Sequence, residues 1–126
     1  MISRKNFNSK TVPRFSDAFP QAVVTGDFVF VSGTVGVDPV TGKLPEGFEQ
    51  QATQAFLNIQ TILEELGSSL DKIVKTTVFM VSGNDFGVLN TVYKSMFPDN
   101  APARSTPQVM PFPGGVQISV ECIAML

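Results

Sequence analysis

The chain has 126 residues, 43% of them hydrophobic and 16% charged, with a formal net charge of −2 and no histidine. This length predicts a single domain over residues 1–126 with one hydrophobic core, and the slight negative charge argues against a nucleic-acid partner. The absence of histidine removes the commonest metal ligand and general base, and the single cysteine, Cys122, excludes an intrachain disulfide or a thiolate cluster, so we expect no metal site.

Two short β-rich runs, Gln21–Thr25 and Phe28–Ser32, are separated by Gly26-Asp27, a pattern typical of a β-hairpin. The second run is apolar at consecutive positions, which predicts a strand inside a sheet that is covered on both faces. Gly33 follows it and allows another part of the backbone, or a ligand, to approach closely.

A helix is expected over Phe48–Leu66, where apolar residues recur with helical spacing. The β-branched run Ile73–Val81 predicts a further strand. A second helix is expected over Phe86–Phe97, with Asn84-Asp85 available to cap its start and Pro98 ending it.

The segment around Arg104 is expected to be extended, because Pro102 and Pro107 disfavour helix. In the last predicted strand, Val116–Leu126, alternation divides the side chains between two faces. Val116, Ile118, Val120 and Cys122 are expected on one face, and Gln117, Ser119 and Glu121 on the other. Cys122 lies in an apolar run, which favours a core residue over a nucleophile.

The predicted order is therefore β-β-α-β-α-β-β, an α+β fold with two helices on one face of a single mixed sheet. Both Phe28–Val31 and Ile73–Val81 are interpreted as apolar on both sides. The face without helices then needs cover, and another copy of the chain is the simplest candidate, so we expect an obligate oligomer.

Arg104 is the only arginine after Arg14, and it lies among small residues and prolines. Its planar fork of donors matches a carboxylate with two hydrogen bonds. A structural alternative is an ion pair between Arg104 and Glu121, which would be required if Glu121 were buried. A surface ion pair is the further alternative for any single arginine.

Blocks over nearly the whole length resemble one known family, the Rid family (YjgF, the reactive-intermediate imine/enamine deaminases). The matching blocks are Gln21–Val23, Phe28–Gly33, Asp38–Gly42, Val74–Phe79, Asn84–Phe86, Asn90–Tyr93 and Pro102–Ser105. The resemblance implies a chorismate-mutase-like subunit and a homotrimer with a site in each of three inter-subunit clefts. It also implies hydrolysis of 2-imino or 2-enamino acids to a 2-keto acid and ammonia, without a metal or cofactor.

The resemblance also implies the site residues. Arg104 would hold the substrate carboxylate, and the other implied substrate-binding residues are Gly33, Phe19, Ser32 and Asn90. The implied catalytic residues are Arg104, Thr106, Ser119 and Glu121.

This chain departs from the best-studied branch of the family at three of these positions. Phe19 replaces a tyrosine, Thr106 replaces a frequent cysteine, and Ser119 aligns with an acidic residue that handles water, while Glu121 is the next acid on that face.

Three other functions stay open at this point. The first is a non-catalytic trimer that senses a small carboxylate in the Arg104 cleft. The second is a deaminase with a larger substrate, in a pocket lined by Phe19 and Phe112. The third, RNA cleavage, is disfavoured by the lack of histidine and by the negative charge.

The expected location is the cytoplasm, with no membrane partner, because no run has the length of a membrane span. Four basic residues precede the first acidic one, Asp17; they are Arg4, Lys5, Lys10 and Arg14. We interpret them as a first strand and loop; the alternative is an organelle-targeting signal.

Overall fold

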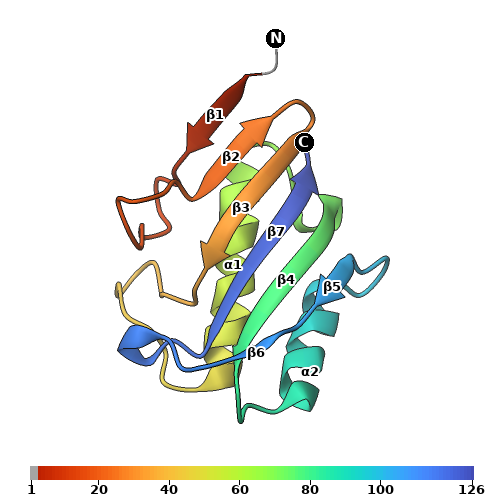
Figure 1. The fold of residues 1–126 in the computed structure, drawn as a ribbon. Helices are drawn as coiled ribbons and strands as arrows, with labels where there is room; N and C mark the ends of the chain where they lie inside the picture. Colours follow the sequence, from red (N-terminus) through yellow and green to blue (C-terminus); the bar gives the residue numbers. More distant parts are fainter. Residues whose placement is uncertain (1–2) are drawn as a thin grey trace.

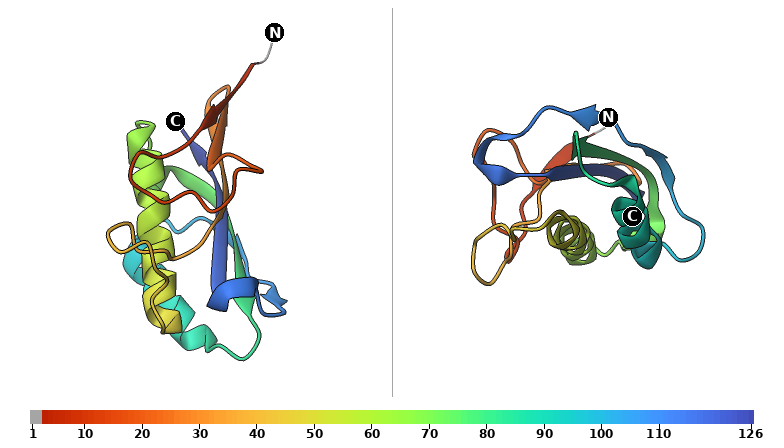
Figure 2. Two further views of the ribbon diagram at one scale, coloured as in Figure 1. Left: turned by 90° about the vertical axis from the view of Figure 1, so that its left-hand side faces the viewer. Right: turned by 90° about the horizontal axis from the view of Figure 1, so that it is seen from below.

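The computed structural model describes residues 3–126 and shows one mixed β-sheet with two helices on the same face (Figures 1 and 2). The helices are α1 (Phe48–Glu65) and α2 (Phe86–Met96). The strands are β1 (Arg4–Phe7), β2 (Ala22–Thr25), β3 (Phe28–Thr34), β4 (Ile73–Val81), β5 (Ala103–Ser105), β6 (Gln108–Val109) and β7 (Ile118–Met125). The predicted α+β class and the placement of both helices are confirmed.

The predicted order of elements omits β1 and β6, although the interpretation of the basic N-terminal residues as a first strand and loop is confirmed. The basic N-terminal segment forms β1, an edge strand paired antiparallel to β2, and the two-residue β6 pairs with β4. Neither strand has the alternating apolar residues by which a strand is recognised in a sequence. The side chains of β1 are mostly exposed, and β6 has only two residues.

The strand order is β1-β2-β3-β7-β4-β5, so the C-terminal strand lies between β3 and β4. β7 is antiparallel to both of these neighbours, whereas β5 is parallel to β4. The β4-α2-β5 connection is thus a crossover that places α2 over this edge of the sheet (Figure 1).

The core lies between the sheet and the two helices. The inward side chains of β7, Ile118, Val120, Cys122 and Ala124, are at most 4% exposed, which confirms the predicted alternation of this strand. Phe56 of α1 is fully buried and packs edge-on against Tyr93 and Phe97, so one aromatic cluster joins the two helices.

Cys122 is a buried free thiol, as predicted, and burial raises its pKa to about 12. Because the thiolate is the reactive species, we expect folded protein at pH 8 to react with a thiol reagent far more slowly than protein unfolded in urea. Absorbance after addition of a disulfide reagent measures both rates. Equal rates in the two states would contradict this prediction.

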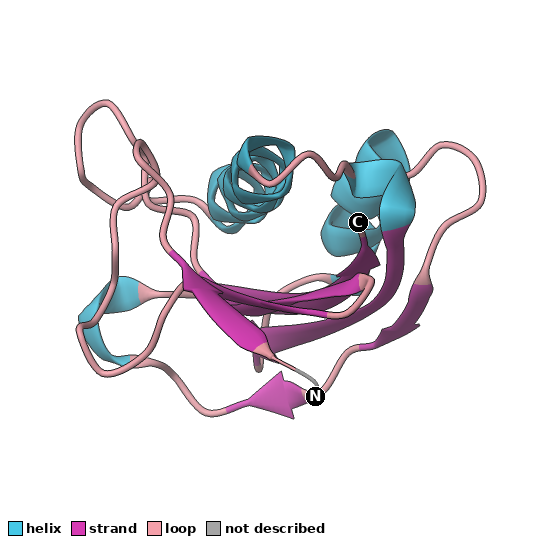
Figure 3. Ribbon diagram, turned by 90° about the horizontal axis from the view of Figure 1, so that it is seen from above, coloured by secondary structure: helices cyan, strands magenta, loops and turns pink. Residues whose placement is uncertain are grey.

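Neither α1 nor α2 covers the opposite face of the sheet, and the segment that contains β6 runs along one end of that face (Figure 3). We call that face the outer face. Phe28, Phe30 and Met125 lie on it and are 44%, 43% and 44% exposed. The interpretation of β4 as apolar on both sides is only partly correct, because Lys75 and Thr77 share its outer face with Phe79. The apolar part of this face therefore extends from β3 and β7 to Phe79 of β4.

Candidate functional site

The Arg104 side chain lies at the edge of the sheet, on the side covered by α2. Arg104 pairs in parallel register with Thr76, whose buried side chain faces the helices, so both side chains point to that face. Nη2 of Arg104 donates a hydrogen bond to Oδ1 of Asn90 at 2.9 Å. The guanidinium carbon is 4.7 Å from the centre of the Tyr93 ring, a distance typical of a cation–π contact.

Tyr93 is a rigid support for this guanidinium. Its hydroxyl lies 2.7 Å from Oγ1 of Thr76, and its ring packs against Phe56 and Phe97. Burial raises the pKa of Tyr93, which outweighs the lowering by Thr76 and Arg104, so the phenol stays neutral. Arg104 is thus fixed from one side, while the bond to Asn90 is its one side-chain hydrogen bond within residues 3–126. The other N–H donors of the fork are available to an anion.

The sequence prediction included Asn90 but missed the role of Tyr93. A signal was present, because Tyr93 is the only tyrosine and follows Asn90 by three residues in the predicted helix. Residues with this spacing share a helix face.

The alternative ion pair between Arg104 and Glu121 is wrong. Glu121 is exposed on the outer face of β7, opposite Thr77, whereas Arg104 lies on the helix side of β5. The two side chains belong to opposite faces of the sheet, and water already solvates Glu121, so it needs no buried partner.

Gly33 and Ser119 are brought together by a bulge in β3. Val31 pairs with Cys122 and Thr34 with Val120, so β3 has one more residue than β7 over this stretch. A Cβ atom on Gly33 would lie 2.8 Å from Oγ of Ser119, so a larger residue here would displace the Ser119 hydroxyl. Ser32 beside it donates from Oγ to the Pro20 carbonyl at 2.7 Å and so fixes the end of the preceding loop.

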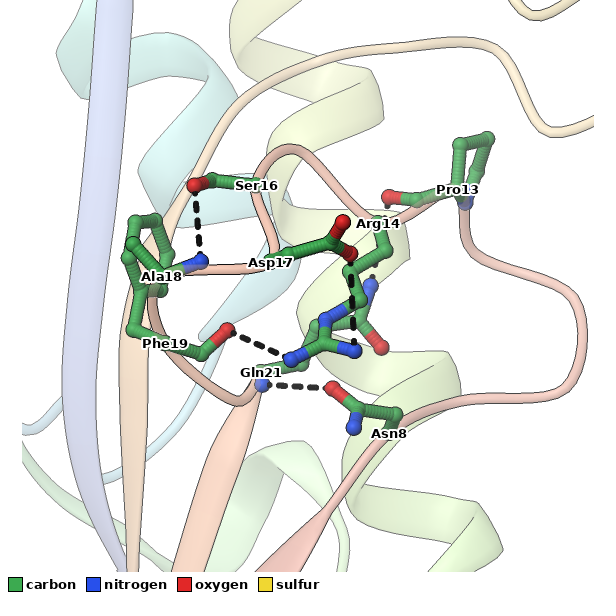
Figure 4. Close-up of polar contacts among 8 residues, drawn as sticks. All are labelled: Asn8, Pro13, Arg14, Ser16, Asp17, Ala18, Phe19 and Gln21. Carbon is green, nitrogen blue, oxygen red and sulfur yellow. Dashed lines mark hydrogen bonds and ion pairs between the residues drawn. The ribbon is translucent and has the colours of Figure 1, made fainter.

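That loop, residues 13–20, carries Phe19 and closes over a cavity of about 330 Å³. Nη2 of Arg14 donates to the Phe19 carbonyl at 3.2 Å, and Nη1 lies 3.8 Å from Oδ1 of Asp17 (Figure 4). Phe19, Ser32 and Gly33 all line the cavity, but Phe112 does not. Phe19 and Phe112 thus do not share this cavity, and a pocket that both line in an assembly of copies stays a prediction.

The predicted site residues form separate groups within one copy. Arg104 and Asn90 lie at the β5 edge, with Thr106 directly after that strand, while Phe19, Ser32 and Gly33 lie beside β3. Two strands, β7 and β4, stand between β3 and β5, which corresponds to about 14 Å across the sheet. Ser119 lies beside Gly33, and Glu121 lies further along the outer face of β7. One copy therefore does not bring all of these side chains together.

Comparison with known proteins places the chain in a family. Residues 10–126 match the model of the endoribonuclease L-PSP family. The chain belongs to this family. A rat relative named 2-iminobutanoate/2-iminopropanoate deaminase is 40% identical over 98% of this chain and 91% of its own length. Among solved structures of the L-PSP family fold, RidA of an Antarctic Psychrobacter superposes with a TM-score of 0.91 at 37% identity, covering 97% of this chain and 99% of that one. TdcF of E. coli with bound serine gives 0.90 at 34% identity, covering 97% and 98%. The resemblance to Rid proteins is thereby confirmed.

No group of three or more histidine, cysteine, aspartate or glutamate residues that could hold a metal ion occurs in the part of this L-PSP family chain that the structure describes. Neither helix among residues 3–126 has the length and apolar character needed to cross a membrane.

Proposed function

We propose that this protein hydrolyses reactive 2-imino and 2-enamino acids to 2-keto acids and ammonia, with Arg104 anchoring the substrate carboxylate. The observation that carries the proposal is the guanidinium held between the Tyr93 ring and Asn90, with the rest of its donor fork available. The name of the rat relative supports the reaction, and the serine bound to TdcF supports an amino-acid-like ligand.

The protein has only to orient the substrate and supply water, because an imine carbon is already electrophilic. Water adds to the C=N carbon to give a carbinolamine, and transfer of a proton to nitrogen lets ammonia leave as the C=O bond forms. Binding the carboxylate to a fixed guanidinium orients this carbon toward the water. Arg104 stays protonated and cannot act as the base, so Glu121, Ser119 and a backbone carbonyl near Thr106 are the candidates for handling the water.

We further propose that the complete site forms between copies of a cytoplasmic homotrimer with chorismate-mutase-like subunits. The separation of Arg104 from Gly33 across the sheet supports a site shared by two copies. The exposed Phe28, Phe30 and Met125 side chains supply apolar surface for such an assembly.

The deciding experiment couples a threonine dehydratase to this protein and follows decay of the 2-iminobutanoate that the dehydratase releases. Acceleration over buffer is the expected result. Calorimetry with 2-ketobutyrate, run in parallel, measures carboxylate binding alone. Binding without acceleration would favour a non-catalytic carboxylate sensor over an enzyme, and absence of both would overturn the proposal.

Ribonuclease activity, named in the family's description, is not proposed, because the chain has no histidine and a net charge of −2.

Replacing Phe30 by aspartate tests the assembly. The substitution places a charge in the middle of the apolar outer face, and we expect the trimer to dissociate. Light scattering after size exclusion measures the mass. Val40→Asp is the control, because Val40 is 93% exposed in a loop and should leave the mass unchanged. A trimer that survives Phe30→Asp would contradict this use of the outer face.

A further inference from the structure

Thr76 is a buried polar residue at a strand position that packing alone would give to an apolar side chain. It has no exposed surface, and the next two side chains of β4 that face the helices, Val78 and Met80, are apolar and fully buried. Valine has nearly the same shape as threonine and would avoid the cost of burying a hydroxyl. The packing of the core therefore does not explain the hydroxyl of Thr76.

The hydrogen bond that the Thr76 hydroxyl makes within residues 3–126 is to the hydroxyl of Tyr93, with the two oxygens 2.7 Å apart. Tyr93 is only 7% exposed and Thr76 is fully buried, so water cannot take the place of either partner. This bond fixes the end of the Tyr93 side chain that points toward the sheet.

Thr76 is also the register partner of Arg104. The two residues lie opposite each other in the parallel pairing of β4 with β5, and both side chains leave the sheet on the helix side. The Tyr93 ring lies between them, because its hydroxyl bonds to Thr76 while its centre is 4.7 Å from the guanidinium carbon of Arg104. A shift of this ring would therefore move the surface against which the guanidinium rests.

We propose that Thr76 is a positioning residue for carboxylate binding by Arg104. The inference rests on the proposed function, in which the anion held by Arg104 is the substrate carboxylate. Thr76 does not contact the substrate, and its hydroxyl acts by holding the Tyr93 ring in place under the guanidinium. An aligned donor fork makes two hydrogen bonds to a carboxylate, and a tilted one makes fewer.

Two substitutions at Thr76 separate this role from packing. Thr76→Ser keeps the hydroxyl and loses the methyl group, whereas Thr76→Val keeps the shape and loses the hydroxyl. Carboxylate affinity should follow the hydroxyl. We expect Thr76→Val to weaken 2-ketobutyrate binding about fivefold, the effect of one lost hydrogen bond, and to raise KM for 2-iminobutanoate by the same factor. Its kcat should stay unchanged, because the carboxylate is bound equally in the ground and transition states, and Thr76→Ser should behave as the wild type does.

The side-chain Nε–H signal of Arg104 in nuclear magnetic resonance spectra tests the placement of the guanidinium without any ligand. Its loss in Arg104→Lys assigns the signal. Tyr93→Leu removes the ring, and with it the ring-current shift, so this variant gives the signal position of an unsupported guanidinium. The signal should move toward that position in Thr76→Val and stay in place in Thr76→Ser. Urea unfolding shows that each variant is folded.

The outcomes distinguish this inference from the proposed function. A wild type that neither binds 2-ketobutyrate nor hydrolyses 2-iminobutanoate would overturn the proposed function, and the Arg104 signal would still decide the role of Thr76. An Arg104 signal that is the same in Thr76→Val as in the wild type would overturn the inference. With an active wild type, so would an unchanged KM in Thr76→Val, or a loss in Thr76→Ser as large as that in Thr76→Val.

Discussion

Replacing Arg104 by alanine should lower kcat/KM for 2-iminobutanoate by about 10²–10⁴. The change removes two charge-assisted hydrogen bonds to the substrate carboxylate, each contributing about 1.5–3 kcal/mol. The loss should be this large because the guanidinium is positioned before substrate arrives, by the Tyr93 ring and by Asn90. The coupled dehydratase assay measures it.

Two variants make this result interpretable. Arg104→Lys keeps the charge but loses the planar fork, so we expect an intermediate loss. Lys94→Ala removes an exposed cation from the same edge of the molecule, at the end of α2, and should change little. If Arg104→Ala lost no more activity than Lys94→Ala, carboxylate anchoring by Arg104 would be refuted.

Phe56→Ala should cost about 3–5 kcal/mol of stability, the second large effect that we expect. Phe56 is fully buried in α1 and makes edge-on contacts with Tyr93 and Phe97 of the other helical segment, with ring centres 5.5 and 5.9 Å apart. Truncation leaves a cavity between the two helices as well as losing apolar burial. Urea unfolding measures the shift, at one fixed protein concentration because assembly contributes to stability.

Leu57→Ala is the matched control for this experiment. Leu57 is the next residue of the same helix and is 37% exposed, so its truncation should cost less than about 1 kcal/mol. Equal midpoints for the two variants would show that the aromatic cluster does not hold the helices together.

Local patterns predict the helices and the long strands well. The bounds expected for β4, Ile73–Val81, are those observed, because a β-branched run between turn residues is unambiguous. The helix expected over Phe86–Phe97 begins where Asp85 caps it, through a hydrogen bond from the Gly87 N–H. These signals lie within a few residues of the element that they define.

The geometry of the candidate site depends on contacts between distant segments, which no local pattern contains. Arg104 faces the helices because it pairs with Thr76, and this register also removes it from Glu121. The cavity at Arg14 arises where two irregular loops meet, and such loops have no periodicity to interpret. The resemblance to Rid proteins identified the site residues. Only the strand order shows that β3 and β5, which hold the two groups, are separated by two other strands.

The strand order has a genetic consequence. If each site takes Arg104 from one chain and Gly33 from the next, a chain carrying Arg104→Ala still offers an intact Gly33 side, and a chain carrying Gly33→Val still offers an intact Arg104 side. Co-expression of the two inactive chains should therefore yield mixed assemblies that regain working sites. Alleles at these positions should fall into two complementation groups, and defects within one group should fail to rescue each other.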